Sequence, residues 1–182
     1  MAGNVWILIG PSGTGKTSLA KDLPRRVPNL KRAVTCTTRA PRNGEQEGID
    51  YYFVSDAQFD FLLASGKLLE STTYGGQRYG LPAEQFLANG GHDLVCVLDM
   101  AGVQHLRDLL APGRARAVFL ESPSPEVLKA RMEERGSTPD EVERRLALIA
   151  MESGRASECE YRVSTTPPYD EVLETVARLI GG

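Results

Sequence analysis

The sequence predicts an α/β fold, a parallel five-stranded sheet with helices on both faces. Short apolar segments alternate with helix-like segments along most of the 182 residues, as in parallel sheets covered by helices. A glycine-rich motif joins the first apolar segment to the first helix, which is typical of P-loop proteins. The stretch from 35 to 85 breaks the alternation, and we expect it to form an inserted α+β lobe within a single domain.

The strands of the sheet are expected in apolar segments short enough to be buried strands. They are residues 5–9, a short piece near 32–36, and residues 93–99, 116–120 and 161–164. The helices are expected at residues 16–23, 101–110, 125–135, 139–152 and 169–180. Pro24 ends the first of these helices, and Ser124 with Pro125 gives the third a good start. The inserted stretch is expected to hold strands at 51–55 and 67–72 and a short helix at 56–65.

Composition excludes several classes of protein. A net charge of -3, from 21 Lys+Arg and 24 Asp+Glu, argues against a nucleic-acid or membrane partner. Cys36, Cys96 and Cys159 are widely spaced and the chain has only 2 histidines, so neither a disulfide framework nor a zinc site is expected. The first apolar run is too short for a signal peptide or a membrane span. We therefore expect a cytoplasmic protein.

A phosphate-binding loop follows the first predicted strand. The segment reads GPSGTGKT and fits the pattern G-x-x-x-x-G-K-[ST]. Its glycines let backbone N–H groups point at phosphate oxygens, Lys16 would reach the β- and γ-phosphates, and Thr17 would bind Mg²⁺. The guanine element N-K-x-D of switch proteins is missing from the sequence, so a GTP-binding switch protein is not expected, and the loop predicts a nucleoside triphosphate as the ligand. The predicted nucleotide-binding residues of the loop, on the ATP side in the resemblance given below, are Gly10, Pro11, Ser12, Gly13, Thr14, Gly15, Lys16 and Thr17.

A second phosphate site is predicted further along the chain. The polar segment 35–45 carries Arg39 and Arg42 three residues apart and is followed by Tyr51. A guanidinium group matches a phosphate dianion better than an ammonium group does. An isolated pair of this kind is more often a solvated basic loop, so the assignment depends on the surrounding sequence.

That surrounding sequence resembles the guanylate kinases over nearly the whole chain. The resemblance rests on TTRAPRNGE, on the following GIDYYFVS, on GPSGTGKT, and on Glu70 before the pair Tyr79-Gly80. It implies that MgATP and GMP, and also dGMP, are converted to ADP and the diphosphate. It also implies three parts: a core of residues 1–33, 86–121 and 153–182, a monophosphate-binding lobe at 34–85, and a lid at 122–152.

The resemblance also implies roles for single residues. Arg39, Arg42, Tyr51 and Tyr79 would hold the monophosphate of GMP, while Thr35, Glu70 and Asp99 would face the guanine. Lys16, Arg135 and Arg145 would be catalytic, with Arg131 on the ATP side. Arg131 and Arg135 share one helix face, where pairing with neighbouring glutamates is the alternative. Phosphoryl transfer needs such cations around the moving group more than it needs a general base.

Glu70 and Asp99 bear on the choice of acceptor. A carboxylate at Glu70 can accept from the adjacent N1–H and N2–H₂ donors of guanine, whereas adenine presents a lone pair at N1. Without the flanking motif, an ordinary exposed strand glutamate would be the simpler interpretation. Asp99 follows an apolar run and could hold Mg²⁺ through water or face the acceptor, and we favour the acceptor side.

The chain departs from the guanylate kinase pattern near the base. Leu81 stands where the family has a small hydroxyl residue, and Val97 replaces the first aspartate of a D-x-D pattern. Gln77 and Arg78 replace Asn-Tyr, and residues 164–166 replace an Asn-Asp-rich stretch near the adenine. These changes keep two alternatives open. One is a related kinase for another phosphorylated acceptor such as ribose 1,5-bisphosphate, and the other is a non-catalytic interaction domain.

Overall fold

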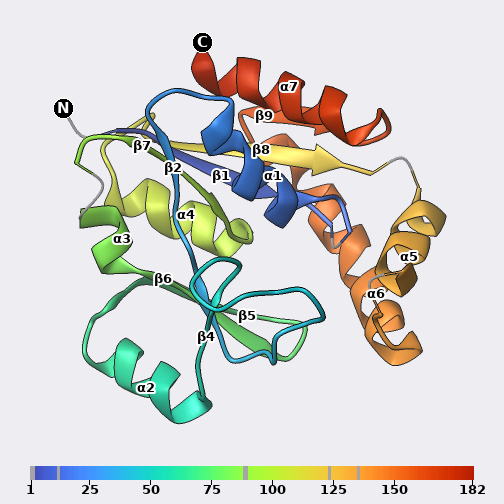
Figure 1. Ribbon diagram of the computed structural model, residues 1–182, viewed down its shortest axis with the longest axis horizontal. Coiled ribbons are helices and arrows are strands. Elements are labelled where there is room, and N and C mark those ends of the chain that lie inside the picture. Colours follow the sequence, from blue (N-terminus) through green and yellow to red (C-terminus); the bar gives the residue numbers. More distant parts are fainter. Residues whose placement is uncertain (1–2, 12, 88–89, 123, 135) are drawn as a thin grey trace.

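The core of the chain is a parallel five-stranded sheet, as predicted. The computed structural model describes residues 3–11, 13–87, 90–122, 124–134 and 136–182, without the side chains of 148–153. Strand order is β2-β7-β1-β8-β9, and every neighbouring pair is parallel (Figure 1). The strands are β1 (Val5–Ile9), β2 (Leu30–Arg32), β7 (Asp93–Val97), β8 (Ala115–Glu121) and β9 (Tyr161–Ser164).

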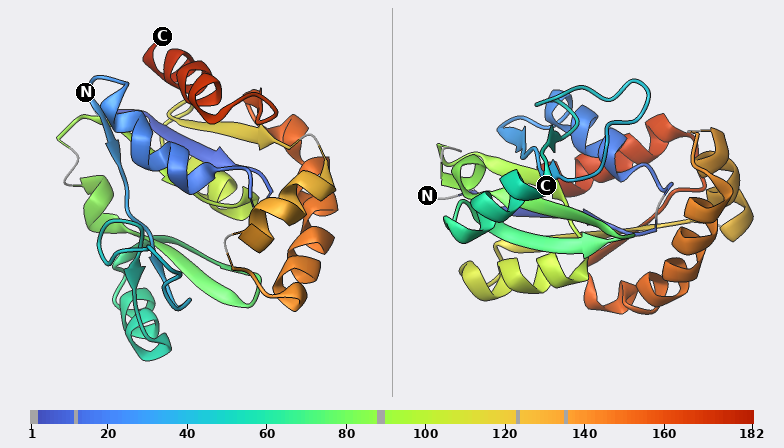
Figure 2. Two further views of the ribbon diagram at one scale, coloured as in Figure 1. Left: turned by 45° about the vertical axis from the view of Figure 1, so that its right-hand side comes forward. Right: turned by 90° about the horizontal axis from the view of Figure 1, so that it is seen from below.

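Helices cover both faces of this sheet. Side chains alternate along a strand, so Trp6 and Leu8 pack on one face while Ile7 and Ile9 pack on the other. The first face is covered by α1 and α7, and the second by α4, whose Val103 is fully buried. Figure 2 shows the two helical layers from further sides. Their bounds are α1 (Lys16–Asp22), η1 (Leu23–Arg25), α4 (Met100–Leu109), η2 (Ala156–Glu158) and α7 (Tyr169–Gly181).

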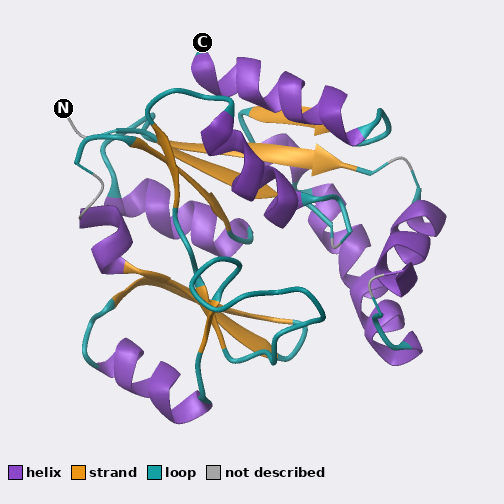
Figure 3. Cartoon of the chain, viewed as in Figure 1, coloured by secondary structure: helices purple, strands orange, loops and turns teal. Residues whose placement is uncertain are grey.

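A second, smaller sheet is formed within the inserted stretch. Its order is β4-β3-β6-β5, with β3 and β4 parallel and the other pairs antiparallel. Figure 3 shows it as a separate group of strands beside the main sheet. A hydrogen-bonded capping box of Ser55 and Gln58 starts its outer helix. The elements are β3 (Cys36–Thr37), β4 (Tyr52–Phe53), α2 (Asp56–Ala64), β5 (Leu68–Tyr74), β6 (Gln77–Pro82) and α3 (Ala83–Leu87).

Two helices form a hairpin at the end of the molecule where the P-loop lies (Figure 1). They are α5 (Pro125–Glu134) and α6 (Pro139–Gly154). Leu128, Met132 and Val142 make a small buried cluster between them, separate from the two larger clusters of the main sheet. The hairpin therefore has an apolar contact of its own, while its polar faces remain available to the site.

The strand predicted near 32–36 lies elsewhere. β2 ends at Arg32, because the chain then leaves β7 and crosses to the second sheet, where Cys36 pairs with Tyr52 and Gly80. The guanidinium of Arg32, the last residue of β2, donates to the backbone carbonyls of Ile49 and Asp50, both at 2.6 Å. The segment that crosses between the two sheets is thus fixed at its start by the hydrogen bonds of Arg32 and at its end by the strand pairing of Cys36.

The sequence analysis also missed β6 and α3. The signal for β6 is Gly75-Gly76, where both glycines have positive φ and close the β5–β6 hairpin. None of the helices in the described parts of the chain combines the length and the apolar character needed to span a membrane.

Candidate active site

The P-loop closes tightly against the sheet. Gly10 has a φ of 135°, and a Cβ there would lie 2.4 Å from the carbonyl oxygen of Leu120 on β8. Only glycine fits this position, so β1 can pass directly into the loop beside its neighbour strand. The hydroxyl of Thr14 donates to the carbonyl of Pro11 at 2.8 Å and fixes the turn. Ser12, also predicted to bind ATP, lies outside the described residues.

Lys16 lies across the loop. Its Nζ donates to the carbonyl oxygens of Gly10 at 2.5 Å and Pro11 at 2.7 Å. A phosphate oxygen is a stronger acceptor for an ammonium group than a neutral carbonyl oxygen is. The lysine is therefore placed to exchange these carbonyls for phosphate oxygens.

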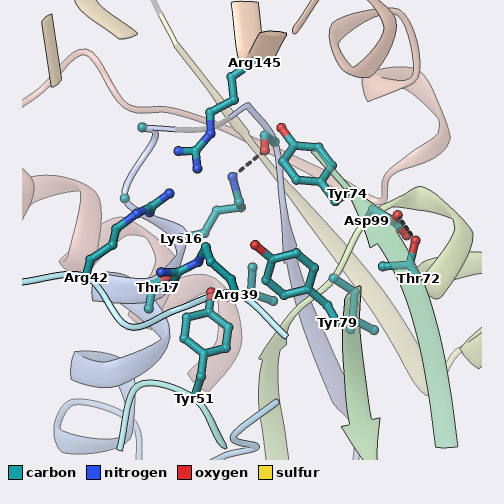
Figure 4. A pocket seen from close by; sticks show the side chains of 15 residues that line it. Lys16, Thr17, Arg39, Arg42, Tyr51, Thr72, Tyr74, Tyr79, Asp99 and Arg145 are labelled. Carbon is teal, nitrogen blue, oxygen red and sulfur yellow. Dashed lines mark hydrogen bonds between the residues drawn. The ribbon is translucent and has the colours of Figure 1, made fainter. Parts of the chain in front are cut away.

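A pocket opens between the P-loop, the second sheet and the helical hairpin. Figure 4 shows its side chains converging from these three parts of the chain. Most of the residues predicted from the two phosphate motifs and from the resemblance meet here. Its lining residues are Gly10, Gly13, Gly15, Lys16, Thr17, Arg39, Arg42, Tyr51, Thr72, Tyr74, Tyr79, Val97, Leu98, Asp99 and Arg145.

Positive charge gathers on one side of this pocket. Arg39 is nearly buried, donates to Glu45 at 2.9 Å, and lies 5.4 Å from the centre of the Tyr51 ring. Burial lowers the pKa of Arg42, and the positive charges of Arg145 and Arg39 lower it further. Guanidinium groups that repel one another in a partly buried place are stabilised by an added anion. The cluster is therefore suited to a phosphate.

Two tyrosines complete the charged end. Tyr51 and Thr17 both line the pocket and lie beside each other there (Figure 4), and burial raises the pKa of Tyr51. Tyr79 lines the same pocket as Arg39, and its ring centre lies 6.0 Å from that of Tyr51. The loop that leads into β4 thus brings Tyr51 to the same pocket as Thr17, the residue predicted to bind Mg²⁺.

Glu70 lies at the opposite end of the pocket, behind its lining. The residue is 5% exposed, and its Oε2 has no hydrogen-bond partner among the described residues. It packs directly on α4, since a Cβ on Gly102 would lie 3.1 Å from its Cδ. Burial and, second, the charge of Asp99 raise the pKa of Glu70 to about 7. A buried carboxyl group without a partner is a strong acceptor site for donors on a ligand.

Asp99 is held in place from two sides. Its Oδ1 accepts from the backbone N–H of Gly102 at 2.9 Å and caps α4, and its Oδ2 accepts from the hydroxyl of Thr72 at 2.6 Å. In Figure 4, Asp99 and Thr72 lie across the pocket from Thr17 and Arg42. The carboxylate is thus at the Glu70 end of the pocket rather than beside Thr17, the residue predicted to bind Mg²⁺.

A second pocket lies on the other side of the P-loop. Arg131 borders it, and its Nη2 donates to the carbonyl of Thr165 at 3.4 Å. Gly13 and Gly15 line both pockets, so the loop is the boundary between them. The full lining is Gly13, Thr14, Gly15, Ser18, Leu19, Arg131, Glu134, Thr165, Pro167, Tyr169 and Val172.

Two pockets that share a P-loop are the arrangement expected of a kinase for a phosphorylated acceptor. The sequence model of the guanylate kinase family matches residues 2–180. The chain belongs to the guanylate kinase family. A guanylate kinase from Thermobifida fusca is 38% identical over 177 residues, covering 94% of this chain and 89% of the relative. One from Methylobacillus flagellatus is 37% identical, covering 99% and 89%.

Structural comparison agrees with this assignment. The crystal structure of guanylate kinase from Anaplasma phagocytophilum superposes with a TM-score of 0.79 at 26% identity. It covers 98% of this chain and 85% of that one. The five-stranded sheet and the separate four-stranded sheet are therefore those of a guanylate kinase fold, and the predicted fold class is confirmed.

Of the remaining positions singled out in the sequence of this guanylate kinase family member, Thr35 and Leu81 lie outside the pocket lining. Thr35 is buried, and its carbonyl accepts from the N–H of Tyr52 at 3.0 Å. Arg135 lies outside the described residues. Leu81, expected near the base, is 1% exposed and packs into the cluster beneath the main sheet, opposite Glu70. Val97 does line the pocket.

Sequence reasoning missed Thr72 and Tyr74, which line the pocket from β5. The signal was present: residues two apart on a strand share a face, so Glu70 implies Thr72 and Tyr74. The pairing of β5 with β6 is regular from Glu70 onward, after an irregularity that follows Leu68. Thr72 and Tyr74 therefore line one wall of the pocket, in the same strand row as the buried Glu70 behind the lining.

The buried carboxyl group predicts a pH-dependent stability. Because the pKa of Glu70 is raised by folding, its protonated form stabilises the folded state, and this contribution is lost as the pH rises through about 7. We expect Glu70→Gln, which cannot ionise, to be more stable than the parent by on the order of 2 kcal/mol at pH 8. The difference should shrink toward zero near pH 4.5. Thermal unfolding of both ligand-free proteins across this range measures it.

Glu84→Gln is the matched control, because Glu84 is exposed on α3. If Glu70→Gln were more stable than the parent by the same free energy at pH 5 and at pH 8, ionisation of Glu70 would not be what destabilises the folded parent.

Proposed function

We propose that the chain transfers the γ-phosphoryl group of ATP to the phosphate of GMP, and of dGMP, giving ADP and the diphosphate. The observation that carries this function is the P-loop shared by two pockets. The pocket beside Arg131 would take the base of ATP, and the pocket with three arginines would take GMP. A phosphoryl group bound by the loop would then face both substrates.

Arg39, Arg42, Tyr51 and Tyr79 would hold the monophosphate of GMP. Arg39 and Arg42 supply guanidinium donors in a partly buried place, and the tyrosines supply hydroxyl groups beside them. A dianionic phosphate would relieve the repulsion between Arg42 and its cationic neighbours. The negative charge of the bound acceptor phosphate would thus offset the repulsion among the guanidinium groups at this end of the pocket.

Guanine would lie toward Glu70, with Asp99 and Thr35 on the same side. The unpartnered Oε2 of Glu70 is the acceptor that guanine can satisfy with its N1–H and N2–H₂ groups. Adenine would place a lone pair against this carboxylate and leave a buried charge unpaired. The bonds of Asp99 to Thr72 and Gly102 support a role at the base rather than at the metal.

For the transfer itself, Lys16 would move from the loop carbonyls to the β- and γ-phosphate oxygens. An oxygen of the GMP phosphate forms the new bond to the γ-phosphorus while the bond to the bridging oxygen of ADP breaks. The acceptor oxygen carries no proton that must be removed, so the site needs cations and alignment rather than a base. Lys16 and Arg145 line the pocket for this role, and we propose Arg135 as a third cation.

Magnesium fits one residue of the site. The hydroxyl of Thr17 lines the pocket beside Tyr51, and no cluster of three or more His, Cys, Asp or Glu suited to a metal occurs among the described residues. Mg²⁺ commonly takes one or two protein ligands and completes its shell with phosphates and water. Thr17 would hold the ion, which when bound offsets the negative charge of the ATP phosphates.

The three predicted parts have distinct tasks in this proposal. The core would hold ATP, the lobe at 34–85 would hold GMP, and the lid at 122–152 would bring Arg131 to ATP and Arg145 to the transferred group. Closure of lobe and lid would exclude water, so that phosphate is not lost by hydrolysis.

The test is an ADP-release assay with MgATP and a panel of acceptors at equal concentration. GMP should be the best acceptor, followed by dGMP, with AMP, UMP and CMP far below. Turnover of ribose 1,5-bisphosphate together with no turnover of GMP would overturn the assignment, and would identify Val97 as part of a different acceptor site.

A further inference from the structure

Strand β5 presents a polar row to the acceptor pocket. Thr72 and Tyr74 line the pocket, while the intervening Ser71 and Thr73 are exposed on the opposite face. Thr72 is directly opposite Tyr79, which lines the same pocket. The hydroxyl of Thr72 therefore belongs to the wall of the site, one step along the strand from Glu70.

The Thr72 hydroxyl links the two layers that form the pocket. It donates to Oδ2 of Asp99 at 2.6 Å, and Oδ1 of the same carboxylate is already occupied by the N–H of Gly102. Thr72 belongs to the second sheet, whereas Asp99 follows β7 of the main sheet and caps α4. With both oxygens bonded, the Asp99 carboxylate has one fixed orientation in the pocket.

The same hydroxyl keeps its own acceptor capacity. A threonine hydroxyl has one hydrogen to donate and two lone pairs that can accept. Its hydrogen is directed to Asp99, so only its lone pairs remain for a ligand. The side chains of Val97 and Leu98 line the pocket beside it, and in such apolar surroundings a hydrogen bond to a ligand is stronger than in water.

We propose that Thr72 is a specificity-determining residue for the purine acceptor, orienting Asp99 and accepting from the 2-amino group of guanine beside Glu70. This inference rests on the proposed function, because it concerns the base end of the same pocket. Glu70 and Thr72 are about 7 Å apart along one face of a strand, a spacing that one purine edge can bridge. Thr72 is thus a positioning residue through Asp99 and a ligand contact in its own right.

The proposal predicts which substrate is affected. IMP lacks the 2-amino group of GMP but shares its sugar, its phosphate and its N1–H donor. Removing the Thr72 hydroxyl should raise KM for GMP about 5- to 10-fold and change KM for IMP less than twofold. The preference for GMP over IMP should fall by the same 5- to 10-fold, with KM for ATP unchanged and kcat within about threefold.

The experiment compares Thr72→Val, which keeps the shape of the side chain, with Thr72→Ser, which keeps the hydroxyl. Thr73→Val is the matched control, because Thr73 is the next residue of β5 and is exposed on the other face. kcat and KM are measured for GMP, IMP and ATP, and thermal unfolding checks each fold. Thr72→Ser should retain most of the parental preference and Thr73→Val all of it.

Each outcome decides the proposal. A GMP-to-IMP preference in Thr72→Val equal to that of Thr73→Val overturns it, as does an equal rise of KM for both acceptors, since that indicates a merely structural role. If Thr72→Val does not fold, Thr72→Ala is measured instead and the same ratio decides. If the parent protein does not phosphorylate GMP, the proposed function itself is contradicted. The activity of the parent toward GMP is therefore measured before the variants are compared.

Discussion

Replacing Lys16 with alanine should lower kcat for GMP phosphorylation by at least about a thousandfold, with little change in thermal stability. Its ammonium group is the cation at the P-loop that would follow the charge developing on the transferred phosphoryl group. In the ligand-free protein its Nζ donates to the backbone carbonyls of Gly10 and Pro11, in a loop whose turn is fixed independently by Thr14. The measurement is ADP release with MgATP and saturating GMP.

Lys21→Ala is the control on the same helix. Lys21 is about half exposed and reaches Asp50 only at 3.8 Å, so this ion pair contributes little to stability. We expect its kcat to stay within about twofold of the parent. Turnover by Lys16→Ala at more than a tenth of the parental rate would remove Lys16 from the proposed role.

Local motifs explain why much of the site could be predicted from the sequence. The P-loop is contiguous, and its strand, glycines and helix follow one another, so its conformation depends little on distant residues. Arg39, Arg42 and Tyr51 likewise lie within one short stretch, and the structure brings them to the loop. The alternating strands and helices gave the five-stranded sheet for the same reason.

Features that depend on pairing between distant strands could not be predicted in this way. Leu81 was expected near the base, and its pairing with Glu70 and its packing into the cluster beneath the main sheet both depend on the register of β6, which the sequence alone does not give. The direction of Asp99 was ambiguous because strand-end carboxylates can point either way. A helix cap at Gly102 and a bond from Thr72, 27 residues away in the chain, fix it.

Replacing Glu70 with alanine should raise KM for GMP about a hundredfold or more, with a smaller effect on kcat and none on KM for ATP. Guanine would lose two hydrogen bonds to a charged group in a buried place, where each is worth about 1.5 to 3 kcal/mol. The preference for GMP over AMP should fall with it. Glu84→Ala on the exposed side of α3 is the control, and an unchanged KM for GMP in Glu70→Ala would remove Glu70 from the base site.

The pH dependence of this KM distinguishes a direct contact from a structural effect. Guanine needs the ionised carboxylate, and with a pKa of about 7 in the free protein Glu70 is increasingly protonated below that pH. KM for GMP in the parent should therefore rise up to tenfold per pH unit from pH 7 toward 5. The GMP phosphate itself titrates near pH 6. In Glu70→Ala, only the titration of the GMP phosphate remains. The ratio of KM for GMP in Glu70→Ala to KM in the parent should therefore fall toward one as the pH is lowered. A ratio independent of pH would mean that Glu70 is ionised throughout, and that its burial against α4 is compensated by a partner other than guanine.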